Sequence, residues 1–233
     1  RATVRDKDFN KELLDLLSDP NLASKKPIYQ FYDKQVQGRM VLTREEADAG
    51  VLLPFNKDTY PQEVQDQAVA LGIASNPYYG EIDANIAGIS AVVEAIQKIT
   101  SVGAEVQAIT DCLCFGNPEK PEQMGDFVSC VNGIKEACNK LGDNNHPVPI
   151  VAGNVSLYNE SKNGAIPASP MISAVGSVKK DQVIRPDFNN ANQIVIMVGD
   201  RQRSLGGSLW YAKNNVKDFD LINYDLDKLK SMN

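Results

Sequence analysis

Strand-like and helix-like segments alternate between residues 69 and 178, and this alternation constrains the fold more than any other feature. Two long helices are predicted at 82–100 and 121–141, because apolar residues recur there at spacings of three and four. Short apolar runs flank and separate these helices, at 69–74, 105–109, 147–152 and 171–178. The pattern predicts an α+β fold of α/β layers, in which a mixed sheet carries both helices on one face.

The remaining segments predict how the chain divides. We expect linker helices in residues 1–33, an α+β domain over 34–180 and the beginning of a second domain over 181–233. The first boundary follows two short helix-like stretches, and the second falls in a polar, asparagine-rich connection. Further strands are predicted at 38–43, 49–55 and 193–198. Among the strands, 147–152 is expected to be central.

Composition and charge exclude several classes of function. The 233 residues carry a net charge of −6 and no basic stripe, which argues against nucleic-acid binding. No apolar run approaches the roughly 18 residues of a membrane span, and no secretory segment follows the charged N-terminus. We therefore expect a cytoplasmic protein that binds neither nucleic acid nor membrane.

The cysteines and the single histidine limit the chemistry. Cys130 and Cys138 fall on a core-facing helical pattern, whereas Cys112 and Cys114 lie two apart at a strand exit. This is not a zinc spacing, and neither a disulfide framework nor a Cys/His metal site is expected. His146 lies in a polar loop, so acid–base chemistry at neutral pH would need a histidine from elsewhere.

The stretch 150–160 is the first candidate for a site. It begins apolar, as a buried strand does, and then carries small and polar residues. Gly153 allows a ligand to approach the backbone closely. Asn154 and Ser156 lie two apart and point to one face of a continuing strand, where their oxygens suit a hard cation or a phosphate.

A second stretch, 110–119, has the same layout. An apolar strand runs into Asp111 and ends in a Gly-Asn-Pro turn. Because ligands collect at strand ends in open α/β sheets, the two stretches together predict a nucleotide and metal site. The alternative is that both are ordinary polar strand exits. At 206–208, Gly-Gly-Ser is either a helix start that holds an anion or, as we favour, a flexible turn.

The two stretches also carry a resemblance to a known family. Residues 111–122 (Asp-Cys-Leu-Cys-Phe-Gly-Asn-Pro-Glu-Lys-Pro-Glu) and 153–160 (Gly-Asn-Val-Ser-Leu-Tyr-Asn-Glu) closely resemble phosphoribosylformylglycinamidine synthase. This enzyme is the ATP-dependent amidotransferase ligase of purine synthesis. Residues 32–38 look like its linker, and 206–208 resemble its later glycine motif. The resemblance covers nearly the whole chain.

The resemblance implies a fragment of a larger enzyme. The family contains two copies of a module in which an N-domain like that of aminoimidazole ribonucleotide synthetase precedes a C-domain. This chain resembles the second N-domain and the start of its C-domain. The family's catalytic histidine belongs to the first copy, so no catalytic residue is expected here. The implied partners are the first half of the synthetase and a glutaminase subunit or domain that supplies ammonia.

The resemblance also implies roles for four residues. Asp111 and Gly153 would contact ATP, Asn154 would be a Mg²⁺ ligand, and Ser156 would contact the formylglycinamide ribonucleotide substrate. The sequence departs from the family pattern at 75–79, at 168–170 and at Leu209, which replaces a usual Glu. These departures leave ligand contacts at 75–79 and 206–209 undetermined.

Two alternatives stay open from the sequence. One alternative to the ligase fragment is a non-catalytic structural half of the same fold. The other is a related small-molecule kinase, although the C-terminal part is too short for a full second domain. Consecutive apolar residues in several strands indicate that both sheet faces require burial. We expect the isolated chain to form a two-fold homodimer, unless helices at 7–18 and 24–32 fold back over the second face.

Overall fold

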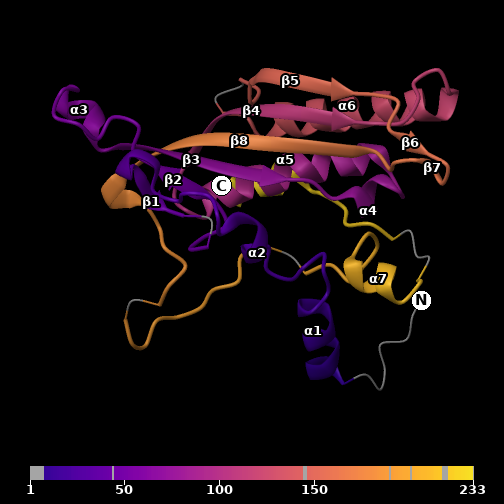
Figure 1. Cartoon of the computed structure of the whole chain (residues 1–233), viewed down its shortest axis with the longest axis horizontal. Coiled ribbons are helices and arrows are strands. Elements are labelled where there is room, and N and C mark those ends of the chain that lie inside the picture. Colours follow the sequence, from indigo (N-terminus) through magenta and orange to yellow (C-terminus); the bar gives the residue numbers. More distant parts are fainter. Residues whose placement is uncertain are drawn as a thin grey trace.

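A six-stranded mixed sheet forms the centre of the molecule (Figure 1). The computed structural model describes residues 8–43, 45–143, 146–188, 190–199, 201–216 and 220–232. Strand order is β1-β2-β3-β8-β4-β5, and only the β4–β5 pair is parallel. The strands are β1 Met40–Leu42, β2 Gly50–Leu52, β3 Gln67–Ala74, β4 Glu105–Cys114, β5 Ile150–Ser156 and β8 Ser169–Lys179. A small hairpin, β6 Glu160–Ser161 and β7 Gly164–Ala165, follows β5.

Two long helices, α5 (Ala84–Thr100) and α6 (Pro121–Leu141), cover one face of this sheet (Figure 1). Asp83 caps α5 by accepting a hydrogen bond from the Ile86 N–H at 3.0 Å, and Pro121 occupies the first turn of α6. The predicted mixed sheet with helices on one face is therefore confirmed. The shorter helices are α1 Phe9–Leu17, α2 Lys26–Tyr29, α3 Gln62–Gln65, α4 Pro77–Gly80, α7 Leu209–Lys213 and α8 Leu226–Met232, with 3₁₀ turns at Val36–Gly38 and Lys180–Gln182.

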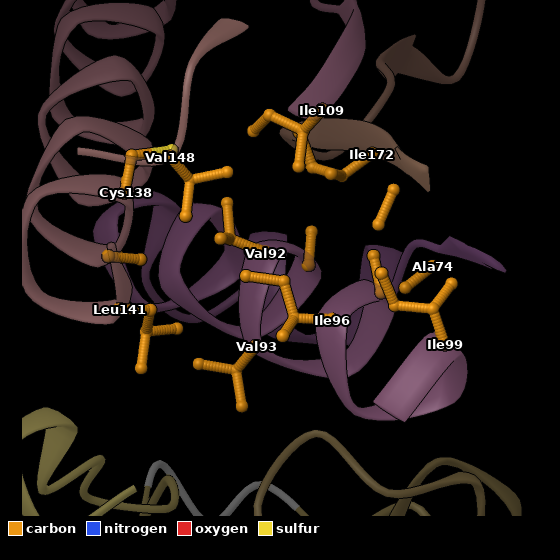
Figure 2. Close-up of a cluster of buried hydrophobic side chains, with 14 of the residues drawn as sticks. Ala74, Val92, Val93, Ile96, Ile99, Ile109, Cys138, Leu141, Val148 and Ile172 are labelled. Atoms are coloured by element: carbon orange, nitrogen blue, oxygen red, sulfur yellow. The ribbon is translucent and has the colours of Figure 1, made fainter. Parts of the chain in front are cut away.

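The hydrophobic core lies between α5 and the sheet and continues between α5 and α6. Figure 2 shows side chains of α5 between those of α6 and those of the strands. Ile96 and Ile99 of α5 and Ile109 and Ile172 of the strands are at most 2% exposed. Cys130 and Cys138 are also buried, as the helical pattern predicted.

Glycines let α5 and α6 approach each other closely. A Cβ on Gly133 of α6 would lie 2.2 Å from the Asn85 carbonyl oxygen, and one on Gly88 of α5 would lie 2.4 Å from the Cys130 carbonyl oxygen. No side chain fits at such distances, so the helix pair depends on both glycines. This contact fixes α6 above the part of the sheet where β4 and β5 pair.

Within the described residues, no helix layer covers the opposite face of the sheet (Figure 1). We call it the open face and define it by the side chains that alternate away from α5 and α6. It includes Leu71, Ile73 and Met171, which are 43%, 58% and 45% exposed. The register adds members from β4, β5 and β8: Cys112, Cys114, Asn154, Ser156 and Ser173.

The N-terminal and C-terminal segments lie beside each other (Figure 1). The Trp210 indole N–H of α7 donates to the Glu12 carboxylate of α1 at 2.7 Å, and Lys213 pairs with Asp19 at 3.1 Å. Helix α1 therefore packs beside α7 (Figure 1). None of the described helices combines the length and the apolar character that a membrane crossing requires.

Several predicted boundaries were wrong. The strand predicted at 147–152 is β5, which lies at an edge of the sheet and not at its centre. The strand predicted at 105–109 continues to Cys114. Residues 193–198 form no strand; Ile194–Val198 are between 65% and 86% exposed. This apolar segment has strand propensity but lies beside no strand with which it could pair.

Candidate functional site

The parallel pairing of β4 with β5 brings the two sequence stretches together. Asp111 is in register with Gly153, Cys112 with Asn154, and Cys114 with Ser156. The two strands are separated by α6 in the chain, and the α6 residue Phe127 packs edge-on against Phe115, which directly follows β4. The sequence prediction that these stretches meet is therefore correct.

Hydrogen bonds join the segments that leave the two strands. The Glu160 carboxylate accepts from the Asn117 backbone N–H at 3.1 Å and pairs with Lys120 at 2.8 Å. The pKa of Glu160 lies below its ordinary value, mainly because of the Lys120 ammonium and to a smaller extent because of the Asn117 N–H. The Tyr158 hydroxyl donates to the Glu119 carboxylate at 3.2 Å.

Asn159 also links the segments that follow β4 and β5, through its side chain. Its side-chain amide donates to the Phe115 carbonyl at 3.0 Å and to the Ser156 carbonyl at 2.9 Å. The preceding Tyr158 has a φ of 61°, so the backbone turns sharply at this point. The result is a rigid exit from both strands, built almost entirely from residues of the two sequence stretches.

The pleat of the sheet divides the four predicted site residues into two pairs. Asp111 and Gly153 lie on the face that α6 covers, whereas Asn154 and Ser156 lie on the open face. A Cβ on Gly153 would be 2.8 Å from a carboxylate oxygen of Asp111. A larger residue at 153 would therefore require the Asp111 carboxylate to move.

Asp111 lies near the end of β4, as predicted, but on the covered face of the sheet. It lies three residues before the end of β4 and is partly buried. Burial raises the pKa of its carboxyl group, while a hydrogen bond from the Asn154 backbone N–H acts in the opposite direction. The carboxylate thus ties β4 to β5 beneath the sheet.

The open side of the strand pair is rich in sulfur, which the sequence interpretation passed over. The Cys112 and Cys114 Sγ atoms are 3.9 Å apart, and the Asn154 amide donates to Cys112 Sγ at 3.4 Å. The pKa of the Cys114 thiol is raised, mainly by burial and to a smaller extent by the neighbouring Cys112 thiol. The two-residue spacing on a strand was the available signal, because it places both thiols on one face.

Two of the stretches at which the sequence departs from the family pattern, 75–79 and 206–209, contact each other away from the β4–β5 pair. Gly207 has a φ of 68°, and a Cβ there would lie 2.0 Å from the Tyr79 ring. Tyr79 is buried, and burial raises its pKa to about 12. Ser208 caps the five-residue helix α7 by accepting from the Tyr211 N–H at 3.2 Å. The Gly-Gly-Ser motif thus opens a helix, and it holds the C-terminal segment against residues 76–80.

A cavity of about 470 Å³ opens elsewhere on the open face. Asp33, Lys34, Met40, Leu71 and Ile73 are among its lining residues, and none of the four predicted site residues is. Counting His, Cys, Asp and Glu alone, the described ranges contain no group of three that could hold a metal ion.

The fold and the position of the strand pair define the class of protein. The chain belongs to the family described as AIR synthase related protein, N-terminal domain, which it matches over residues 46–178. It is 42% identical over 208 residues to phosphoribosylformylglycinamidine synthase subunit PurL of Methanothrix thermoacetophila. It is 37% identical over 203 residues to the protein of that name from Thermomicrobium roseum.

These relatives are longer proteins, and solved structures show the same relation. The alignments cover 88% and 86% of this chain but only 26% of each relative. Thermotoga maritima PurL complexed with ATP is similar with a TM-score of 0.57 and 26% identity, covering 71% of this chain and 25% of that one. PurL of the same organism complexed with FGAR gives a TM-score of 0.56 and 25% identity, covering 70% and 24%. The chain therefore spans about a quarter of the proteins it resembles.

Proposed function

We propose that this chain is part of the ATP-dependent ligase that converts formylglycinamide ribonucleotide, ATP and ammonia to formylglycinamidine ribonucleotide. The observation that carries the proposal is the parallel β4–β5 pair, which joins residues 111–122 and 153–160 into one structural unit. Relatives named for this activity, and similar structures complexed with ATP and with FGAR, support it. Glutamine, hydrolysed by a separate glutaminase subunit or domain, would be the ammonia source.

The reaction requires positioning and charge neutralisation more than acid–base chemistry. ATP phosphorylates the substrate amide oxygen, and ammonia then displaces the phosphate and leaves an amidine. The protein gains rate by aligning the reactants and by stabilising charge on the phosphoryl group. A rigid strand exit suits such a role, and the first half of the synthetase would supply the histidine.

The residues on the two faces of the strand pair would have separate roles. On the open face, Asn154 would offer an amide oxygen to Mg²⁺, and the Ser156 hydroxyl would contact the ribonucleotide. Mg²⁺ is usually held by few protein oxygens together with phosphates and water. A single neutral oxygen fits that pattern, and Mg²⁺ would add positive charge beside the phosphates. Gly153 and Asp111 would contact ATP.

Asp111 supports a second candidate function, a structural half without catalysis. Its carboxylate lies under α6 and accepts from the Asn154 N–H, which is a structural duty. Titration of the isolated chain with Mg-ATP distinguishes the candidates. A nucleotide-facing wall should bind Mg-ATP and lose binding on Asn154→Ala, whereas a structural half should show no binding at millimolar nucleotide.

The isolated chain should not complete the reaction. It lacks a histidine at 75–79, where the family's first copy has one. Purified chain, supplied with ammonia, Mg-ATP and the ribonucleotide, should form no amidine, while the longer synthetase that contains it should turn over. Amidine formation by the chain alone would contradict the proposal that the reaction also requires the first half of the synthetase.

The open face supplies the surface for a partner. In the synthetase, we propose that the first half covers it; in the isolated chain, a second copy would do so, giving a two-fold homodimer in the cytoplasm. Exposed Leu71 and Ile73 of β3 favour burial there. Light scattering should give about twice 25.5 kDa.

A charge on the open face should break this dimer. Ile73→Glu should give a monomer, whereas Val128→Glu, at a similarly exposed position on α6, should not. A monomeric wild-type chain at micromolar concentration would exclude the dimer.

A further inference from the structure

The open face beside β5 also carries soft donors that the proposed magnesium position does not use. Mg²⁺ prefers oxygen, yet Cys112 and Cys114 place two thiols next to Asn154, with their Sγ atoms 3.9 Å apart. Both side chains retain partial exposure. The two thiols are held on a strand of the main sheet, so their separation is set by a rigid element rather than by a loop.

The separation of the two sulfur atoms matches that of two ligands on one ion. Thiolate sulfur lies about 2.3 Å from a first-row d¹⁰ ion such as zinc. Two such sulfurs are then about 3.8–4.0 Å apart for angles between tetrahedral and trigonal. The observed 3.9 Å lies within this interval, so the thiols can share an ion without moving the strand.

A third sulfur lies on the neighbouring strand. Met171 of β8 is in register directly opposite Cys112, so its side chain projects on the same face. Directly opposed Cβ atoms of antiparallel strands lie about 4.5–5.5 Å apart. Met171 is 45% exposed, and its unbranched side chain can turn toward the thiols. This part of the open face therefore carries two thiols on β4 and a thioether on the neighbouring strand, with the Asn154 amide beside Cys112.

We propose that Cys112, Cys114 and Met171 form a binding site for a soft monovalent d¹⁰ cation of the Cu(I) type. Thiolate and thioether ligands select Cu(I), whereas Mg²⁺ and Ca²⁺ require oxygen. The Asp111 carboxylate, the nearest hard donor in the sequence, points to the other face. Binding releases the two thiol protons to solvent and changes no oxidation state.

The experiment uses the purified chain under anaerobic, reducing conditions. Cu(I) is supplied as its complex with the chromophoric chelator bicinchoninate, and loss of the chelator's colour reports transfer to the protein. We expect one Cu(I) per chain. Cys112→Ser and Cys114→Ser should each weaken binding at least tenfold, and Met171→Leu, which keeps the apolar shape, should weaken it several-fold.

Two matched variants separate this site from other sulfur atoms. Met124→Leu removes a similarly exposed methionine from α6, and Cys138→Ala removes a buried thiol; both should bind Cu(I) as the wild type does. Circular dichroism confirms that each variant is folded.

Three results would overturn the proposal. They are failure of the wild type to take Cu(I) from the chelator at micromolar concentration, unchanged binding by Cys112→Ser, and tighter binding of Zn²⁺ than of Cu(I). The last would leave a metal site but assign it to the wrong class of cation. None of these readouts depends on ligase activity, so the proposal can fail while the proposed function stands.

Discussion

At the scale of single residues, the contact between Gly207 and Tyr79 links parts of the chain that are far apart in sequence. Gly207→Ala combines a left-handed backbone with a Cβ 2.0 Å from the Tyr79 ring. Left-handed strain costs about 1–2 kcal/mol and overpacking about 1–3 kcal/mol more. We expect a loss of about 2–5 kcal/mol in the free energy of unfolding, measured with urea.

Gly38→Ala is the matched control for Gly207→Ala. Gly38 has a similar φ of 64°, but nothing lies within 4 Å of its Cβ position. It should lose only the strain of about 1–2 kcal/mol. Equal losses in the two variants would show that the Tyr79 contact contributes nothing.

Glu160 predicts a dependence of stability on pH. Lys120 and the Asn117 N–H lower its pKa in the folded state. A lowered carboxyl pKa stabilises the fold above the ordinary pKa of 4.5, and this stabilisation disappears as pH falls through the folded pKa. Glu160→Gln should therefore lower Tm at pH 7, with the difference from wild type shrinking below about pH 4.5.

A Tm difference for Glu160→Gln that stays constant from pH 7 to pH 3 would contradict the role of the Lys120 pair.

At the scale of elements, the α5–α6 contact depends on backbone proximity. Gly133→Ala would place a Cβ 2.2 Å from the Asn85 carbonyl oxygen and should cost about 1–3 kcal/mol. Gly125, on the same helix, has nothing within 4 Å of its Cβ position. Gly125→Ala should therefore be neutral or stabilising by up to about 1 kcal/mol. The comparison is made by urea denaturation, and similar losses in both would contradict close helix packing.

Strong periodicity was enough to predict these elements. The helix predicted at 121–141 has the bounds of α6, and the one at 82–100 begins only two residues before α5. Strand ends were less accurate, because an apolar run indicates burial, while β4 continues through Asp111 and Cys112 by pairing with both neighbours. Ile194–Val198 shows the opposite case, in which strand propensity alone makes no strand without a partner.

The candidate site was predictable only in part. The meeting of 111–122 with 153–160 followed from a shared sheet edge, and the side of Asn154 and Ser156 followed from their two-residue spacing. That Asp111 lies on the opposite face depends on register across strands, which no spacing within one strand reveals. The pairing of Met171 with Cys112 depends on the same register.

At the scale of the whole molecule, helices cover one sheet face, and no helix layer of the described residues covers the other (Figure 1). Residues 1–33 and 181–233 were predicted as separate units, and these boundaries stay a prediction. The described parts of both segments meet through Trp210 with Glu12 and Lys213 with Asp19. The open face therefore remains the surface through which a second half could complete a site around Asn154 and Ser156.

The most direct measurement is turnover of the longer synthetase that contains this chain, with Asn154→Ala compared with Ser173→Ala. Both side chains lie on the open face, but only Asn154 is assigned to the reaction. Removing one preorganised polar group costs about 10²–10³ in rate. We predict a loss of that size for Asn154→Ala at limiting Mg-ATP and less than about threefold for Ser173→Ala. Full turnover by Asn154→Ala would contradict the assignment of this face to the ligase site.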